Sequence, residues 1–486
     1  MTPNSVLSFY NSINLDLGRQ VECCMDHASS EERSALFVAT LTSFLNPFML
    51  SSVNVALPAI QKDLSLDAVQ LSWISTAYLL ATAVTLLPAG KVADIHGRKK
   101  VFNIGLSLYA LASTASAFAG SAAWLIGLRV LQGAGAAMTI TTGTAILTSV
   151  YPPNKRGRAM GIYVAAVYAG LSAGPFIGGL MTQYLGWPSL FLVVVPLSLA
   201  SLWITRQYLK GEWAEARGDR LDFAGSMLYG AATILFIYGA TNLPADWAWV
   251  MVADAAVLLL AFVWYERRTA MPVFDVSLFF VNRAFAFSGF AALIHYAATF
   301  ALTFLLSLYL QYLKGMSPRD AGALLVLQPV VMAVCSPLAG RVADRIEARY
   351  LASGGLTLTA ICLGGFALIT PRTPLVAIGV NLVLIGLGYA LFSSPNMSAI
   401  MGAVPKHQYG IAAGAAATMR LMGQMLSMTA ATLMLSVYLG SRPIAPDTYL
   451  LFLDSMKMVL ALFSGMCVIG IYFSLRRGRI LKRDMQ

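Results

Sequence analysis

The side chains that could do chemistry in this chain are few, and four ionisable ones lie inside long apolar stretches. They are Arg129, Asp254, His295 and Arg420. A charge in apolar surroundings is costly, so such residues usually bind an ion or ligand or relay a proton. An imidazole, with an unperturbed pKa of about 6.5, can bind and release protons. His295 is therefore a candidate proton carrier, and the alternative is a hydrogen-bonded histidine that only packs between helices.

The other candidates each have two interpretations. Arg129 and Arg420 either take part in binding and proton transfer or only tie helices together through backbone carbonyls. For Asp254 a structural role is favoured, because its helix lies outside the expected core. Asn46 and Asn396 stand next to prolines. At such kinks freed backbone groups can bind polar parts of a substrate, or the helix only bends.

The elements that must hold these side chains are membrane-spanning helices. Hydrophobic residues make up 58% of the 486 residues and charged residues 11%, whereas a soluble domain carries roughly a quarter charged residues. Apolar stretches long enough to cross a bilayer of about 30 Å recur from residue 36 to residue 475, with short connections between them. We expect an all-α integral membrane protein with about fourteen transmembrane helices.

A repeated segment divides these helices into two halves. Gly90-Lys-Val-Ala-Asp94 recurs as Gly340-Arg-Val-Ala-Asp344, 250 residues later (340 minus 90). This repeat predicts two parallel bundles with a substrate site between them, and it leaves two extra helices in the middle. The expected parts are a tail at 1–34, a six-helix bundle at 35–209, a linker with two extra helices at 210–282, a second six-helix bundle at 283–475 and a basic tail at 476–486.

The positions of the cations predict the orientation. Lys and Arg gather in every second connection and in the C-terminal tail, and such connections are typically cytoplasmic, so both termini are expected in the cytoplasm. The net charge of +11 then reflects orientation and not nucleic acid binding. Four histidines and five cysteines show no metal-ligand or disulfide spacing, so we expect no cofactor and no metal.

The connection after the second expected helix carries a specific resemblance. Gly90-Lys-Val-Ala-Asp94-Ile-His-Gly97-Arg98 resembles the signature loop of the major facilitator superfamily. Its glycines permit a tight turn, and Asp94 can stabilise a helix N-terminus or pair with a cation. The loop would act as a latch that favours one conformation, or its cations would only set the topology.

The second copy of this loop departs from the family pattern. It keeps Gly340, Asp344 and Arg345, but Glu347 stands where the glycine is expected. Gating is therefore expected of the first copy, and for the second copy it stays open.

A segment in the fourth expected helix is similar to the second motif of the family. It reads Arg129-Val-Leu-Gln132-Gly133-Ala-Gly135. The resemblance implies a part for Arg129, with Gln132 beside it, in proton transfer, and the small residues let a neighbouring helix approach closely.

The fifth expected helix resembles the motif that marks antiporters in this superfamily. It reads Gly170-Leu-Ser-Ala-Gly174-Pro175-Phe-Ile-Gly178-Gly179. Glycines four residues apart form a smooth packing face, and Pro175 permits a kink. The resemblance implies exchange of substrate against an ion.

Further segments narrow the resemblance to the fourteen-helix drug and proton antiporter branch. They include Ser52-Val-Asn54-Val-Ala-Leu-Pro58 and Leu308-Tyr-Leu-Gln311, and Asn54 joins the candidate coupling and substrate residues. Met49 stands where multidrug members of this branch often carry an acid. If Arg129 and Arg420 face one cavity without that acid, an anionic or neutral substrate is favoured over a lipophilic cation.

The resemblance implies a secondary active transporter that exports drugs or metabolites across the plasma membrane by alternating access, in exchange for protons. Its expected partners are a small-molecule substrate, protons and the lipid bilayer, and a periplasmic adaptor is left open. A dedicated exporter or facilitator of one metabolite without proton coupling is the alternative. A membrane enzyme or sensor is disfavoured, because no cluster of acids, histidines or cysteines is visible and no large soluble part is present.

Overall fold

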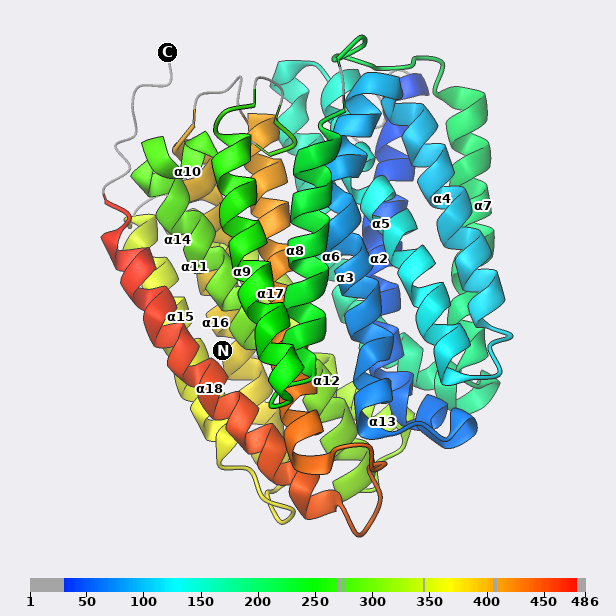
Figure 1. The fold of residues 1–486 in the computed structure, drawn as a ribbon, viewed down its shortest axis with the longest axis vertical. Helices are drawn as coiled ribbons and strands as arrows, with labels where there is room; N and C mark the ends of the chain where they lie inside the picture. Colours follow the sequence, from blue (N-terminus) through cyan, green and yellow to red (C-terminus); the bar gives the residue numbers. More distant parts are fainter. Residues whose placement is uncertain are drawn as a thin grey trace, which may run out of the picture.

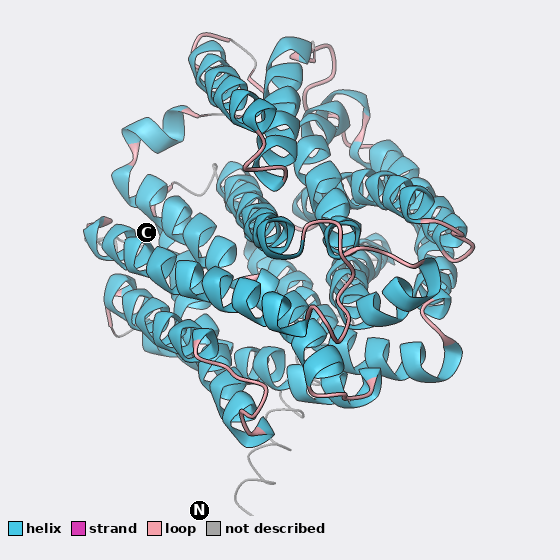
Figure 2. Cartoon of the chain, turned by 60° about the horizontal axis from the view of Figure 1, so that its bottom comes forward, coloured by secondary structure: helices cyan, strands magenta, loops and turns pink. Residues whose placement is uncertain are grey.

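A computed structural model describes residues 30–219, 221–269, 272–274, 276–343, 346–404 and 409–478. The regular elements of these residues are all helices, most of them running along one common direction (Figures 1 and 2). Thirteen helical segments of the described chain are long and apolar enough to cross a membrane. The prediction of an all-α membrane fold is confirmed.

The N-terminal half consists of six long helices. The pairs α2 and α6, α3 and α5, and α4 and α5 pack side by side, and α7 covers α4. The helix α4 begins with three cations and is the least apolar of the six, yet it runs beside α5 and α7 through the same height (Figure 1). The bounds are α2 (Ser30–Leu64), α3 (Ala68–His96), α4 (Arg98–Ser116), α5 (Ala122–Val150), α6 (Pro153–Leu185) and α7 (Pro188–Tyr208).

The C-terminal half uses more, shorter pieces. One continuous apolar stretch is divided at Phe300, where the amide of Ala301 donates to the hydroxyl of Ser427 at 2.9 Å. A side chain of another helix thus satisfies that backbone donor. The same stretch ends in a short π-helix. The bounds are α11 (Arg283–Thr299), α12 (Ala301–Leu308), η1 (Tyr309–Leu313), α13 (Pro318–Leu325), α14 (Leu327–Ala343), α15 (Ala348–Ala367), α16 (Leu375–Gly402), α17 (Tyr409–Leu439) and α18 (Tyr449–Arg476).

Two extra helices and a short one connect the halves: α8 (Phe223–Thr241), α9 (Asp246–Glu266) and α10 (Ser277–Val281). The helix α8 contacts α3 of the first half and α17 of the second, and Tyr229 donates to the carbonyl of Ala83 at 3.2 Å. The helix α9 packs on α8 and is otherwise largely exposed. The pair therefore lies outside the two halves, in front of their junction in Figure 1.

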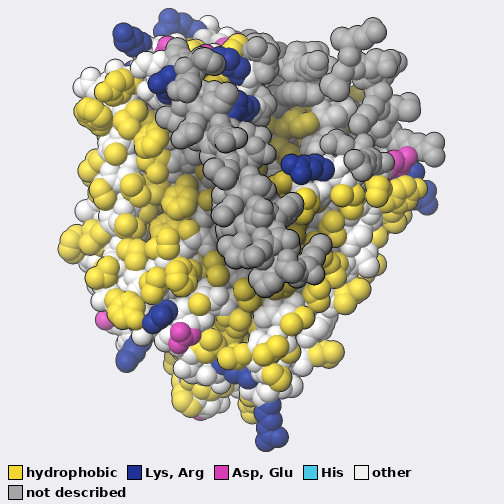
Figure 3. All heavy atoms as spheres, turned by 180° about the vertical axis from the view of Figure 1, so that it is seen from behind, with side chains coloured by type: hydrophobic (Ala, Val, Ile, Leu, Met, Phe, Trp, Pro, Cys, Tyr) yellow, Lys and Arg dark blue, Asp and Glu magenta, His cyan; other side chains and the backbone are white. Residues whose placement is uncertain are grey.

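The bundle has two chemically different ends. The end that carries the α3–α4 connection holds Lys91, Arg98, Lys99 and Lys100, and we call it the basic end. The opposite end, which carries the α2–α3 connection, is called the far end. Where described residues are visible in Figure 3, hydrophobic side chains predominate at middle height, and most charged side chains lie toward the two ends. This distribution suits a protein whose middle lies in hydrocarbon.

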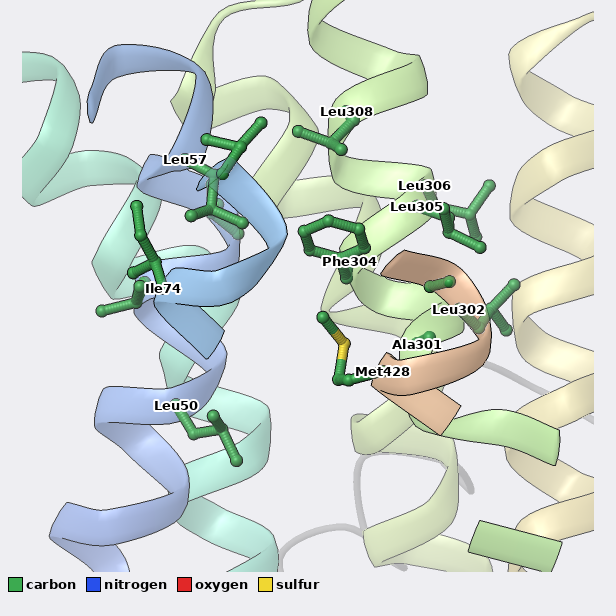
Figure 4. Close-up of a cluster of buried hydrophobic side chains, with 14 of the residues drawn as sticks. Leu50, Leu57, Ile74, Ala301, Leu302, Phe304, Leu305, Leu306, Leu308 and Met428 are labelled. Atoms are coloured by element: carbon green, nitrogen blue, oxygen red, sulfur yellow. The ribbon is translucent and has the colours of Figure 1, made fainter. Parts of the chain in front are cut away.

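A large apolar cluster joins the two halves. It contains Leu50 and Leu57 of α2, Phe304 and Leu308 of α12, and Met428 of α17, all buried. In Figure 4, Phe304 and Leu308 project from α12 toward the side of the cluster that Leu57 contributes. Burial of such side chains between the halves contributes dispersion attraction that helps to hold the halves together.

Candidate transport site

The signature loop is a tight corner between α3 and α4. Gly97 has a φ of +113°, a conformation in which residues with a side chain are strained. The carboxylate of Asp94 accepts a hydrogen bond from Nε of Arg98 at 2.9 Å. Arg98 also donates to Ser149 of α5 at 2.6 Å. The predicted pairing of Asp94 with a cation is therefore present, and the cation is Arg98 of the same loop.

The linker after α7 covers this corner. Glu215 accepts two hydrogen bonds from Arg98, at 2.7 and 2.9 Å. The carboxylate of Glu212 accepts from the backbone amide of Lys99 at 2.9 Å, in the first turn of α4, where negative charge is favoured. The amide of Ala216 donates to the carbonyl of Asp94 at 2.9 Å. In Figure 1 the linker runs over this end of the bundle.

The remaining glycines of the two loop copies differ in their surroundings. A Cβ added at Gly90 would meet nothing within 4 Å, so its lack of a side chain is not required for close packing. A Cβ added at Gly340 would lie 3.0 Å from the hydroxyl of Ser394. Asp344 and Arg345 lie outside the described residues.

Arg129 is enclosed within the N-terminal half. Its side chain has no exposed surface, and Nε donates to the carbonyl of Ile74 at 3.1 Å. One Nη donates to Gln132, which in turn donates to Ser113 of α4 at 2.7 Å. The guanidinium lies over the ring of Tyr78, 4.3 Å from its centroid. These contacts connect α3, α4 and α5 and agree with the interpretation in which Arg129 ties helices together.

The asparagines at and near the prolines also bond within their own halves. Asn46 donates to Thr139 at 3.3 Å, and Asn54 accepts from Ser75 at 2.8 Å. Asn396 donates to the carbonyl of Ser288 at 3.1 Å. It also accepts from the buried Arg477 at 2.9 Å. Their side-chain amides thus stabilise helix contacts in this conformation.

The glycine motif of α6 has two packing faces. On one face, Gly174 and Gly178 lie against Ser51 and Ser52 of α2, and Ser52 donates to the carbonyl of Gly174 at 3.0 Å. Gly170 is packed in the same way, against the carbonyl of Phe44. Any side chain on this face would collide with α2, so the predicted smooth packing face is present.

The other face of this motif contacts the C-terminal half. Gly179 lies against the backbone of Pro318, and Gly322 of α13 lies against the backbone of Pro175. Each pair leaves no room for a Cβ. The two helices therefore cross with their backbones in direct contact, as small residues allow in membrane proteins.

Hydrogen bonds reinforce this crossing at the far end. Gln311 of η1 donates to the carbonyl of Val55 at 2.9 Å, and Tyr312 donates to Gln61. Further bonds between the halves join Arg319 to Tyr184 at 3.3 Å, the amide of Ala68 to the carbonyl of Arg442 at 3.2 Å, and Thr76 to Thr432 at 3.4 Å.

At the basic end, the hydrogen bonds of the described residues stay within one half or join a half to its own linker. The halves are thus bonded together from their middle to the far end, and the far end is closed.

His295 lies within the C-terminal half and has no exposed surface. Its ring stacks on Phe392 with centroids 4.2 Å apart, and Tyr389 and Tyr296 lie at 4.5 and 5.5 Å. Neither ring nitrogen has a hydrogen-bond partner. Two polar ring atoms are thus left buried and unpaired among the described residues, and the choice between a proton carrier and a packing histidine stays a prediction.

Arg420 lies in the C-terminal half, whereas Arg129 is enclosed in the N-terminal half. It is half-buried on α17 and lies within electrostatic range of Tyr163 of α6 and Tyr296 of α11. The expectation that the two arginines face one cavity is not met, because Arg129 is sealed between α3, α4 and α5 by its own contacts.

Two further positions singled out in the sequence, Asp254 and Met49, differ in their burial. Asp254 is exposed on α9, away from both halves. Met49, at the position where the sequence resemblance leads us to expect an acid, is fully buried in α2.

The sequence comparisons identify the family. The chain matches the Major Facilitator Superfamily over residues 39–428 and again over residues 288–480. It belongs to this superfamily. The second match begins within the C-terminal half, in agreement with the repeated architecture. The chain is therefore a multi-pass membrane transporter and not an enzyme, and the resemblance noted in the motifs is confirmed.

Relatives of this transporter include proteins whose names state the compound that they transport. It is 30% identical over 385 residues to the riboflavin transporter RibZ of Clostridioides difficile, covering 79% of this chain and 84% of that protein. It is 31% identical over 416 residues to the tetracenomycin C resistance and export protein of Streptomyces glaucescens, covering 82% and 74%. Among solved structures, a peptide transporter in complex with alafosfalin has a TM-score of 0.66 at 15% identity, with coverage of 92% and 96%.

Several residues of this transporter were not predicted to act at the site. The tyrosines near Arg420 sit in apolar helices that also contain many other aromatic residues, so nothing in the sequence marks them. Gln311 was recognised as part of a family segment but had no assigned role. The acidic residues of the linker could have been found from their position, since Glu212 and Glu215 are the first carboxylates after Asp94 and follow the sixth expected helix, on the same predicted side as the signature loop.

Proposed function

We propose that this transporter exports small organic molecules across the plasma membrane by alternating access, in exchange for protons and with both termini in the cytoplasm. The observation that carries the proposal is the closure of the far end by Gly179, Gly322 and Gln311, while the described residues of the basic end form no hydrogen bond between the halves. Cation-rich connections are typically cytoplasmic. The conformation is then closed to the outside, which is the state in which an exporter takes up its substrate.

The names of the relatives support export of organic compounds. One relative is named as a resistance and export protein for tetracenomycin C, and another as a riboflavin transporter. The α6 glycine motif supports exchange, because it forms part of the contact that must open and close between the halves. Coupling to protons is assigned to His295, whose two ring nitrogens are unpaired in the bundle.

A facilitator or exporter of one metabolite without proton coupling is the second candidate. It is favoured by one observation, the buried Met49 at the position where an acid would bind a proton. The two candidates differ in whether a pH gradient drives accumulation of the substrate.

The test uses inside-out vesicles from cells that express the protein. The vesicle lumen is made acidic, and uptake of a panel of cationic, neutral and anionic aromatic compounds is followed with and without a protonophore. Proton-driven export predicts uptake that the protonophore abolishes and that His295→Ala reduces at least about tenfold.

Asp254→Asn is the matched control, because it removes an ionisable group that is exposed on α9. It is expected to keep the uptake of the unmodified protein. Uptake that continues unchanged with the protonophore would contradict proton exchange and favour the second candidate, transport without proton coupling. Uptake of no compound above the level of vesicles without the protein would contradict export.

A further inference from the structure

Arg420 is a charged side chain in the middle of the bundle without a protein partner. It lies roughly 17 Å along α17 from the first residue of that helix, at about 1.5 Å per residue. Within the described part of the chain it makes no hydrogen bond and no ion pair. Arg129 is the contrast, since its guanidinium is bonded to a carbonyl and to Gln132. An unpaired guanidinium at this depth is costly and favours binding of an anion.

One tyrosine from each half lies within electrostatic range of Arg420. Tyr163 of α6 and Tyr296 of α11 are within its electrostatic range, and Tyr168 of α6 is within range of Tyr296. At about 1.5 Å per residue, Tyr163 and Tyr296 lie roughly 15 to 20 Å from the basic ends of their helices, at the depth of Arg420. Each hydroxyl can donate a hydrogen bond to an anion.

A close helix contact fixes part of this arrangement. Gly423 of α17 lies against the backbone of Leu293 and Ala297 and against Tyr296, where a Cβ would be 2.8 Å from the Cβ of Tyr296. Because α11 and α17 meet directly one helical turn from Arg420, the phenol of Tyr296 and the guanidinium stay near each other.

Aromatic rings extend the site on the C-terminal side. Tyr296 neighbours His295, which in turn contacts Tyr389 and Phe392 with centroids 4.5 and 4.2 Å away. Aromatic faces and edges stack favourably on planar rings. Asp254 and Asp454, the carboxylates within the apolar stretches of α9 and α18, are both exposed. No described carboxylate forms an ion pair with Arg420.

We propose that Arg420, together with Tyr163 and Tyr296, binds the acidic group of aromatic monoanions, such as carboxylates or sulfonates. The guanidinium forms paired hydrogen bonds with the two oxygens, the phenols of both halves donate to the remaining lone pairs, and the ring stacks near Tyr296. Because a phenol of α6 and a cation of α17 share the anion, its binding bridges the two halves. This inference rests on the proposed transport of small organic molecules and specifies their class.

The test measures binding and transport separately. A naphthalenesulfonate, the matched uncharged sulfonamide and a matched trimethylammonium compound are titrated into purified protein in detergent. The expected result is tightest binding of the sulfonate, weakened at least about tenfold by Arg420→Gln, as loss of a charge-assisted hydrogen bond predicts. Arg420→Lys keeps the charge without the planar fork. It is expected to bind the sulfonate more weakly than the unmodified protein and more tightly than Arg420→Gln.

Arg372→Gln is the matched control, because it removes the same charge from an exposed position at the far end. It is expected to bind the sulfonate like the unmodified protein. Equal binding of the three compounds by the unmodified protein overturns the proposal without any variant. If Arg420→Gln does not fold, Tyr296→Phe replaces it and is expected to weaken sulfonate binding about threefold to tenfold.

Failure of the anion site and failure of the export function give different experimental results. Arginine-dependent sulfonate binding with no vesicle uptake would support the site and contradict the export function. Vesicle uptake of cations at the same rate as sulfonates, with sulfonate binding unaffected by Arg420→Gln, would support export and overturn the anion site.

Discussion

Replacing Gly322 by alanine should open the far end of the transporter. A Cβ at this position would collide with the carbonyl oxygen of Pro175 and lie 2.9 Å from its carbonyl carbon, whereas ordinary contacts begin at 3.4 Å. The helix α13 must therefore retreat from α6 by at least about 0.5 Å, the difference between these distances. Overpacking of this kind costs about 1–3 kcal/mol. The cost falls only on the closed state, so the ratio of open to closed protein should rise about 5- to 150-fold.

The assay follows a thiol at the buried position Leu57, which has no exposed surface and belongs to the apolar cluster between the halves (Figure 4). In a cysteine-free background, Leu57→Cys is labelled with a membrane-impermeant maleimide from the far side. Labelling should be slow in the parent and at least about fivefold faster when Gly322→Ala is added.

Gly161→Ala is the control, because it makes the same substitution in α6 at a position where a Cβ meets nothing within 4 Å. Both substitutions remove a helical glycine, so their shared gain in helix propensity of about 1 kcal/mol cancels in the comparison. Equal labelling rates in the Gly322→Ala and Gly161→Ala proteins would refute the assignment of the α6–α13 crossing as the far-end closure.

Three further predictions concern the signature loop and the buried histidine. Gly97→Ala should lower the stability by about 1–3 kcal/mol in detergent, because its φ is +113° and its Cβ would collide with the linker carboxylate. Glu215→Gln should leave the unfolding temperature nearly unchanged, since its side chain is 68% exposed and such pairs contribute about 1 kcal/mol or less. The same change should speed hydrogen exchange of the linker amides, because the bonds to Arg98 hold the linker down. His295→Phe should not lower the unfolding temperature, because no hydrogen bond of the ring is lost and a phenyl ring can stack on Phe392.

Each of these predictions has its own counter-result. Gly218→Ala is the control for Gly97→Ala, because its φ is +100° but its Cβ would meet nothing within 4 Å. Equal losses of stability in the two variants would show that the collision of the added Cβ with the linker carboxylate has no effect. Unchanged exchange in Glu215→Gln would show that the linker is held by other contacts. A clear fall in the unfolding temperature of His295→Phe would mean that the imidazole has a partner after all.

The sequence was sufficient for the fold because the relevant signals are strong. Long apolar stretches identify the helices, and the repeat of Gly90-Lys-Val-Ala-Asp94 locates the division into halves. The glycine spacing in α6 also predicted a packing face correctly. It could not indicate that the same motif has two partners, since Gly179 faces α13 while Gly174 faces α2.

The orientation of single side chains was much harder to predict. In a soluble helix, polar residues mark the outer face, but in a membrane both the lipid-facing and the protein-facing sides are apolar. Arg129 and Arg420 therefore looked alike in the sequence. Only the structure separates them, by bonding Arg129 to Ile74 and Gln132 and leaving Arg420 near tyrosines of two other helices.

The most direct test of proton-coupled export is substrate-triggered proton movement in liposomes. Purified protein is reconstituted around a trapped pH dye, and a naphthalenesulfonate is added on one side. Proton-coupled export predicts proton movement opposite to the substrate, lost in His295→Ala and kept in Asp254→Asn. Movement of the sulfonate across the liposome membrane with no change in the dye signal would contradict proton exchange and leave the uncoupled facilitator as the function.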